Sequence, residues 1–353
     1  MTFARVQYQR LRRLIDEFAK FAVVGGAGVL ITNGACDLLR RVARKGTLAA
    51  VAATILVTAT GCLTPLRSQP PLAPAAVPAS PLVGVYEPGS PGSWSNVAGF
   101  TTATGVRPRV VVYYSAWKSS FAGSFARTAW DHGAYVLVQL EPKDVTLASI
   151  AAGDSDGYLR SFAGDVIAFG HPVIVSFGHE MNGTWYSWGQ GHASPADFVA
   201  AWRHVVGVFQ DEGAANVTWL WTVSSIAGAS GSLSQWWPGT DWVTWAGVSG
   251  YYYRASDSFG SVFGSTIAAV RTLTTAPLLI AETAVGTTPD RESEIDALFA
   301  QVSRLRLAGV VWFDEAQHAG IYHQDWRLEH DRAALAAFTA AVAAHLQAPP
   351  PGG

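Results

Sequence analysis

The sequence is poor in cysteine and in charged residues. Its two cysteines, Cys36 and Cys62, both precede the globular part of the chain, which excludes a disulfide framework or a cysteine-based zinc site there. Charged residues make up only 14% of the 353 residues, and no basic patch with interleaved aromatics occurs in the body of the chain, which argues against nucleic-acid binding. The nine histidines lack metal-ligand spacing, so neither a metal nor another cofactor is expected.

Hydrophobic residues, glycine and tryptophan are abundant instead. The chain is 49% hydrophobic and holds 35 Gly and 14 Trp. This is enough for one large domain with a sizeable core, and we expect a monomer. The tryptophans exceed ordinary core needs, which is a weak indication of ligand stacking.

The first 80 residues differ in composition from the rest. Residues 1–45 carry nine Lys/Arg and three Asp/Glu, a surplus of about +6 that leaves about −8 for the remainder. An apolar run over 46–62 ends in Ala59-Thr60-Gly61-Cys62, which resembles a bacterial lipoprotein box. Plain signal-peptide cleavage and an uncleaved anchor remain alternatives, and a mis-assigned start or a fusion remnant would account for 1–45. We expect a secreted protein or one tethered to the outer face of the membrane through a lipid on Cys62.

A Pro/Ala-rich linker over 63–80 precedes the expected domain at 81–347, and 348–353 form an expected disordered tail. Within the domain, apolar runs typical of parallel strands alternate with amphipathic helical segments. Ser194-Pro195 predicts a helix start, and Gly213 and Gly309 predict helix stops. The strands are expected at 82–86, 109–114, 134–140, 173–177, 217–222, 245–250, 278–281 and 310–313. Eight such strands predict an α/β fold of the (β/α)₈ TIM-barrel type, with an open doubly wound sheet as the alternative.

Polar side chains follow several of these strands. Barrel enzymes carry their reacting groups at the carboxyl ends of the strands. The fourth predicted strand ends in His179-Glu180, and the seventh ends in Glu282. Two carboxyl groups that face a shared centre suit glycoside hydrolysis, and aromatics beside one of them favour its protonated form.

The stretch around Glu180 resembles a known family. It reads His-Glu-Met-Asn-Gly-x-Trp-Tyr-x-Trp over 179–188, which resembles the acid/base signature of glycoside hydrolase family 26, the β-mannanases. Supporting segments run in the same order through 82–338, and they include Ser-Pro-Ala-Asp at 194–197, Asn-Val-Thr-Trp at 216–219, Ile-Ala-Glu-Thr at 280–283, Val-Trp-Phe at 311–313 and Asp-Trp-Arg at 325–327.

The resemblance implies a retaining barrel glycosidase that acts on a polysaccharide without a cofactor. Glu180 would be the general acid/base and Glu282 the nucleophile. The implied substrate-binding residues are His179, Asn182, Trp185, Trp188, Tyr251 and Trp312, with Tyr251 also bonded to the nucleophile. For each tryptophan, core packing is an equal alternative.

The sequence departs from the family pattern at several subsite positions. Ser176 stands where relatives often carry Arg, Ser224 where Asn is common, and Thr244 and Ser249 where acidic residues are usual. We therefore expect an exported endo-β-glycosidase with β-1,4-mannan as the default substrate. The alternatives are a β-1,3-1,4-glucanase, another β-glycanase or transglycosylase, and a non-catalytic carbohydrate-binding barrel of the cell envelope.

Overall fold

The computed structural model describes residues 72, 78–225, 233–316 and 324–346. The chain divides after Ser68, and all of the described residues belong to the unit Gln69–Gly353. The expected segments 1–45, 46–62 and 348–353, together with most of the linker, lie outside the described residues.

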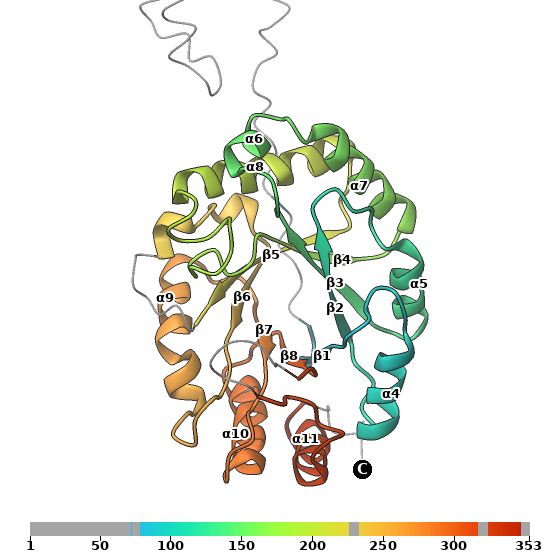
Figure 1. Ribbon diagram of the computed structural model, residues 1–353, viewed down its shortest axis with the longest axis vertical. Coiled ribbons are helices and arrows are strands. Elements are labelled where there is room, and N and C mark those ends of the chain that lie inside the picture. The colour runs from blue at the N-terminus through green and yellow to red at the C-terminus, as the bar shows by residue number, and fades with distance from the viewer. Residues whose placement is uncertain (1–71, 73–77, 226–232, 317–323, 347–353) are drawn as a thin grey trace, which may run out of the picture. The chain divides into compact units, whose positions relative to one another are not determined.

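Eight parallel strands close into a barrel in the order β1 to β8, with helices outside them (Figure 1). This confirms the (β/α)₈ prediction and excludes the open sheet. The strands are β1 Leu82–Tyr86, β2 Val110–Ala116, β3 Tyr135–Glu141, β4 Val173–Phe177, β5 Val217–Ser224, β6 Trp245–Ser249, β7 Leu278–Thr283 and β8 Gly309–Phe313. Closure is made by β1 and β8, which pair along their whole length.

The helices follow the strands in turn. They are α4 Ser95–Thr104, α5 Gly123–Asp131, α6 Leu147–Ala151, α7 Asp156–Phe169, α8 Pro195–Glu212, α9 Ser265–Leu273, α10 Arg291–Arg304 and α11 Arg332–His345. Between β5 and β6 the described residues hold only the 3₁₀ turns η1 Leu233–Trp236 and η2 Thr240–Trp242, and the π-helical turn η3 Gly260–Gly264 leads into α9.

Local sequence signals explain the ends of α8. The Ser194 hydroxyl accepts a hydrogen bond from the backbone N–H of Asp197 at 3.0 Å, and Pro195 occupies the first turn. Gly213 ends the helix with a φ of 85°, a left-handed conformation that glycine adopts without strain. The predicted stop at Gly309 is wrong, because α10 already ends at Arg304 and Gly309 is the first residue of β8.

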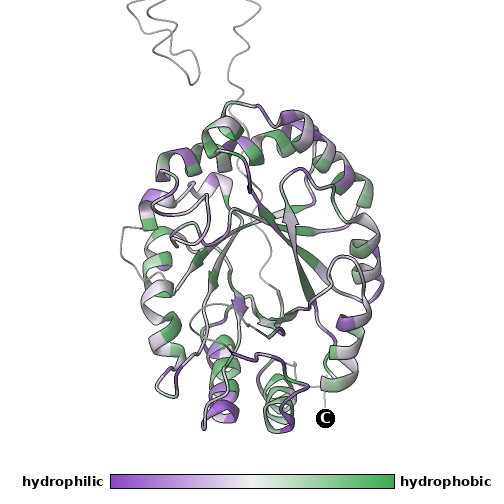
Figure 2. Cartoon of the chain, viewed as in Figure 1, coloured by the Kyte–Doolittle hydropathy of each residue, from purple (hydrophilic) through white to green (hydrophobic). Residues whose placement is uncertain are grey.

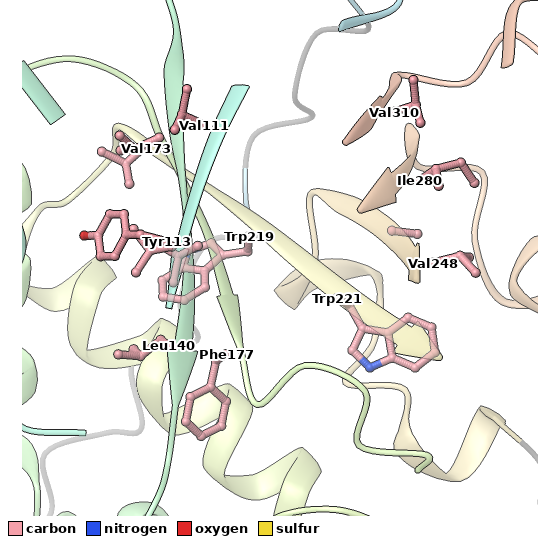
Figure 3. Close-up of a cluster of buried hydrophobic side chains, with 14 of the residues drawn as sticks. Val111, Tyr113, Leu140, Val173, Phe177, Trp219, Trp221, Val248, Ile280 and Val310 are labelled. Atoms are coloured by element: carbon pink, nitrogen blue, oxygen red, sulfur yellow. The ribbon is translucent and has the colours of Figure 1, made fainter. Parts of the chain in front are cut away.

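Two hydrophobic layers build the core. A small cluster fills the barrel interior, from residues such as Val112, Leu137 and Leu279. A larger layer lies between the strands and the helices. Figure 3 shows part of that outer layer, and its labelled side chains are Val111, Tyr113, Leu140, Val173, Phe177, Trp219, Trp221, Val248, Ile280 and Val310. The strands are correspondingly apolar while the helices mix both kinds of residue (Figure 2).

Candidate active site

The turn after β4 presents Glu180 at the carboxyl ends of the strands, here called the mouth. Glu180 has a φ of 55°, a left-handed conformation that is uncommon for a residue other than glycine. Its backbone N–H donates to the carbonyl of Thr222 on β5 at 2.9 Å, which ties the turn to the neighbouring strand. Backbone strain of this kind persists where the surrounding structure enforces it, and it concentrates at functional sites.

Asn182 fastens the same turn to the end of β5. Its side-chain Nδ2 donates to the Ser224 carbonyl at 2.7 Å, and its Oδ1 accepts from the Ser224 N–H at 2.8 Å. The Asn182 side chain therefore bonds both the N–H and the carbonyl of Ser224, the two backbone groups that a neighbouring strand would otherwise bond. Because both polar groups are engaged and the residue is buried, the structure gives Asn182 a supporting position rather than the expected substrate contact.

The Glu180 carboxyl group is buried and receives donors on both oxygens. Trp185 donates its indole N–H to Oε2 at 2.8 Å, and the hydroxyl of Ser249 on β6 bonds Oε1. Burial raises the pKa of Glu180, while hydrogen bonds from Ser249, Trp185 and Ser224 oppose the rise. Ser249, a departure from the family pattern, is therefore a direct partner of Glu180.

A bulge in β7 turns Glu282 toward the mouth. Leu279 and Ala281 point into the barrel, so strict alternation would send Glu282 outward. The pairing with β6 instead steps from Val248–Ile280 to Ser249–Glu282, which leaves one extra residue on β7. A bulge re-aims the side chain that follows it, and Glu282 thereby comes beside Ser249, the partner of Glu180.

Two tyrosines hold the Glu282 carboxylate. Tyr114 at the end of β2 donates to Oε2, and Tyr251 after β6 donates to Oε1. Burial and then the charge of Glu180 raise the pKa of Glu282 to about 7, although both phenols act in the opposite direction. Because the charge of Glu180 acts on the pKa of Glu282, the ionisation of one carboxyl group is linked to that of the other.

The donors around the pair allow a proton on Glu180 while Glu282 is ionised. Each Glu282 oxygen accepts from a phenol, which favours the ionised form. At Glu180, by contrast, Ser249 Oγ also lies 3.4 Å from the carbonyl oxygen of Val223. The serine can therefore turn its own hydrogen to that carbonyl and accept a proton from Oε1. A protonated Glu180 beside an ionised Glu282 is the arrangement that an acid and a nucleophile require.

His179 lies beside the pair as a neutral imidazole. Burial, with a smaller contribution from Lys143, lowers the pKa of His179 to about 3. Its Nε2 is 3.0 Å from the Tyr186 hydroxyl, and its ring lies 5.6 Å from that of Tyr114. The Nδ1 atom is buried and has no hydrogen-bond partner among the described residues.

Of the three tryptophans expected to bind substrate, only Trp185 is exposed. Its side chain is 45% exposed, whereas Trp188 and Trp312 are each 1% exposed. Trp188 stacks on Tyr186 with centroids 4.3 Å apart and donates to the His179 carbonyl at 2.9 Å. Trp312 packs edge-on against Phe338 of α11 at 5.5 Å. This placement corrects the expectation for Trp188 and Trp312, which support the site from the core and offer no face to a sugar.

Sequence reasoning did not identify several residues of the mouth. Phe313, not Trp312, faces inward from β8, where it stacks on Tyr86 at 4.8 Å and meets Tyr251 edge-on at 5.9 Å. Tyr114 was also missed, although strand alternation from Val110 and Val112 would have pointed it inward. Among the described residues, no group of three or more His, Cys, Asp or Glu is arranged to hold a metal ion.

A comparison with known protein families identifies the family of this chain. The family model described as glycosyl hydrolase family 26 matches residues 157–341, just over half of the chain. The chain belongs to glycosyl hydrolase family 26. Both Glu180 and Glu282 lie inside the matched range.

Curated relatives of this family 26 chain carry different names. Endoglucanase H of Acetivibrio thermocellus is 28% identical over 274 residues, which cover 72% of this chain and 30% of that protein. Beta-1,3-xylanase TXYA of a Vibrio species is 31% identical over 111 residues, which cover 31% of this chain and 23% of that protein. The chain thus spans less than a third of the length of either relative.

Solved structures share the fold. The catalytic domain of the endo-beta-1,4-mannanase of Bacillus sp. JAMB-750 matches with a TM-score of 0.59 at 15% identity, over 76% of this chain and 86% of that one. A modular endo-beta-1,4-mannanase from Cellulomonas fimi matches with a TM-score of 0.59 at 17% identity, over 75% and 70%. At such identities the likeness is one of fold.

Proposed function

We propose that this chain is an endo-acting, retaining β-glycosidase that hydrolyses a β-linked polysaccharide, with β-1,4-mannan as its first candidate substrate. The observation that carries the proposal is the pair Glu180 and Glu282, one with donors compatible with protonation and the other held by two phenols. The mannanase neighbours support the choice of mannan.

The reaction proceeds in two displacements. In the first, Glu180 gives its proton to the glycosidic oxygen while a Glu282 oxygen bonds the anomeric carbon, and the leaving sugar departs with that proton. In the second, Glu180 takes a proton from water, the water oxygen bonds the anomeric carbon, and the ester bond to Glu282 breaks. Two inversions give a product with the anomeric configuration of the substrate.

A substrate panel tests this proposal directly. The purified full-length chain is incubated with β-1,4-mannan, mixed-linkage β-glucan, β-1,3-xylan and cellulose, and reducing ends are measured. We expect hydrolysis of at least one, with retained configuration when fresh product is followed by proton NMR, and at least a hundredfold loss in Glu282→Ala. Inactivity on every polysaccharide, or an inverted product, would count against the proposal.

A β-glucan is the second candidate substrate. The relative named endoglucanase H aligns with 72% of this chain, a far larger share than the xylanase covers. The departures at Ser176 and Ser249 lie inside the barrel mouth, where Ser176 bonds Thr222 at 3.0 Å and Ser249 bonds Glu180. Side chains shorter than the usual Arg and acid change the space beside the acid. The two candidates are distinguished by kcat/KM measured on each polysaccharide: a higher value on β-glucan than on mannan would favour the glucan.

Two further readings use the same residues. A transglycosylase would use the same carboxylates, and it is recognised by longer products at high acceptor concentration. A binding-only barrel would retain polysaccharide on an affinity gel equally in the wild type and in Glu282→Ala, with no hydrolysis by either. Paired acids argue against that reading, because binding alone does not need them.

For localisation we propose export and tethering through a lipid on Cys62. The sequence Ala59-Thr60-Gly61-Cys62 after an apolar run supports it. Within the described residues, no helix has both the length and the apolar character to cross a bilayer. Labelling of bacterial cells with a radioactive fatty acid should mark the wild type and not Cys62→Ser. An unlabelled wild type that is released into the medium would refute the tether.

A further inference from the structure

Two phenols, rather than one, hold the Glu282 carboxylate. We propose that Tyr114 is a second positioning residue of the nucleophile, which keeps Glu282 ionised and fixes the plane of its carboxylate. The inference rests on the proposed function in that it takes Glu282 as the nucleophile. The two donors come from different parts of the barrel, Tyr114 from β2 and Tyr251 from the segment after β6, and each bonds a different oxygen.

The position of Tyr114 follows from the alternation of β2. Val110 and Val112 fill the barrel interior, so Tyr114 points inward two residues further on. Tyr113 points the other way and meets Phe125 of α5 at 6.0 Å. Figure 3 shows the Tyr113 ring in the outer hydrophobic layer. Adjacent tyrosines of one strand therefore have unrelated environments.

Neighbouring rings restrict the movement of Tyr114. Tyr86 meets it edge-on with centroids 5.1 Å apart, and His179 lies at 5.6 Å on another side. A braced ring holds its hydroxyl in place at little further entropic cost, which is what a positioning group requires. Burial raises the pKa of Tyr114 well above its ordinary value, so the phenol keeps its proton and remains a donor.

Holding both oxygens has a consequence for the reaction. With a single donor the carboxylate could rotate about its last side-chain bond, whereas two donors on opposite oxygens fix that rotation. When one Glu282 oxygen bonds the anomeric carbon, it loses its charge and its phenol bond weakens. The other oxygen becomes the ester carbonyl and keeps its donor. The two phenols therefore have different partners in the free enzyme and in the covalent intermediate.

The first test measures the carboxyl group directly and needs no substrate. In full-length protein carrying ¹³C-labelled glutamate, the Glu282 signal is assigned by its loss in Glu282→Gln and titrated with pH. Removing one donor from the anion in Tyr114→Phe should raise the pKa of Glu282 by about one unit. Tyr113→Phe removes a phenol from the other face of the same strand and should leave that pKa unchanged.

The second test measures the same effect in the reaction. The acid limb of kcat/KM against pH should move to higher pH in Tyr114→Phe by the amount seen in the NMR titration, with kcat/KM lowered about tenfold or more. Tyr252→Phe serves as the kinetic control, because Tyr252 follows Tyr251 in the chain but packs in the outer hydrophobic layer, 6.1 Å from the ring of Phe263. A Tyr114→Phe profile that matches the wild type in shape and differs only in height would overturn the positioning role.

A third variant keeps the test decisive if Tyr114→Phe does not fold. Site-specific 3-fluorotyrosine at position 114 keeps the ring and the hydroxyl but makes the O–H a stronger donor. The pKa of Glu282 and the acid limb should then both move to lower pH. No movement in either would refute the inference. If the NMR shifts occur while no polysaccharide is hydrolysed, the positioning stands and the proposed function fails. If hydrolysis is normal while neither the pKa of Glu282 nor the acid limb moves, the proposed function stands and the positioning role of Tyr114 fails.

Discussion

At the scale of single residues, Trp185 joins the substrate side of the mouth to the acid itself. Its ring is 45% exposed, and its indole N–H is held by Oε2 of Glu180 at 2.8 Å. An indole nitrogen only donates, so Oε2 is the oxygen that accepts from Trp185, while Oε1 bonds the Ser249 hydroxyl. A sugar oxygen that approaches Oε2 of Glu180 must therefore displace this N–H or approach Oε2 from another direction.

The first prediction concerns this hydrogen bond. Trp185→Phe removes a donor that lowers the pKa of Glu180, so that pKa rises. The alkaline limb of kcat/KM, where the acid loses its proton, should move to higher pH. Trp130→Phe, a tryptophan stacked on His171 in another part of the barrel, is the control and should leave the limb in place. An unchanged limb in Trp185→Phe would show that the bond does not persist in the working enzyme.

A second prediction separates the two steps of the reaction. Glu180→Gln keeps the size of the side chain but cannot supply a proton, so kcat/KM on polysaccharide should fall by about 10²–10⁴-fold. An aryl glycoside with an acidic leaving group needs no protonation, and its first step should be largely spared, seen as a burst of released phenol. Equal loss on both substrates would assign Glu180 another role.

At the scale of secondary-structure elements, the alternation of β8 decides which aromatic residue reaches the mouth. Val311 and Phe313 point inward, while Trp312 points toward α11 and donates its indole N–H to the Trp326 carbonyl at 3.1 Å. Motif matching places Val-Trp-Phe in the right strand but does not say which face each residue takes. The alternation rule, applied along the strand, does.

The third prediction compares two tryptophans. Trp312→Ala leaves a cavity between β8 and α11 and should lower the free energy of unfolding by about 3–5 kcal/mol. Trp185→Ala, at an exposed position, should change that free energy by less than about 1 kcal/mol and reduce kcat/KM instead. Urea unfolding followed by circular dichroism, together with assays at full folding, measures both. A stable Trp312→Ala with weakened substrate binding would contradict the core placement.

At the scale of the whole molecule, the seam between β1 and β8 carries buried acids. Burial and then the charge of Asp314 raise the pKa of Glu87 to about 10. Burial and the charge of Glu329 raise the pKa of Asp314 to about 8. The charge of Glu315 also raises the pKa of Glu87. Glu87 and Asp314 line a cavity of 440 Å³, and Arg327 is the one cation among the described residues that line it.

The fourth prediction follows from the sign of these shifts. A carboxyl group whose pKa is higher in the folded chain stabilises the fold fully below its unfolded pKa near 4.5, and this contribution is lost as pH rises toward about 10. Glu87→Gln cannot ionise, so its melting temperature should rise relative to wild type as pH increases from about 7 to about 10. Glu292→Gln, an exposed acid on α10, should show no such trend. A constant difference across this range would refute the shift.

Sequence reasoning reached the barrel and both carboxylates because each depends on local patterns. Apolar runs at regular spacing gave the strands, and strand ends gave Glu180 and Glu282. Tyr114 and Ser249 could not be assigned as their partners, because those contacts join residues 168 and 69 positions apart along the chain. The burial of Trp188 likewise depends on its stack with Tyr186, which the turn after β4 creates. The distances that decide chemistry are properties of the closed barrel.

The bulge in β7 lets two neighbouring residues, Ala281 and Glu282, both point to the inside of the barrel. Strict alternation would turn one of the two outward, so both face the interior only while β7 keeps its bulge, which is a condition on the backbone of this strand. The loops at the mouth impose no such condition, since their insertions leave strand register untouched. Divergence within this architecture can therefore reshape the loops at the mouth freely, while β7 keeps the bulge that brings Glu282 beside Ser249.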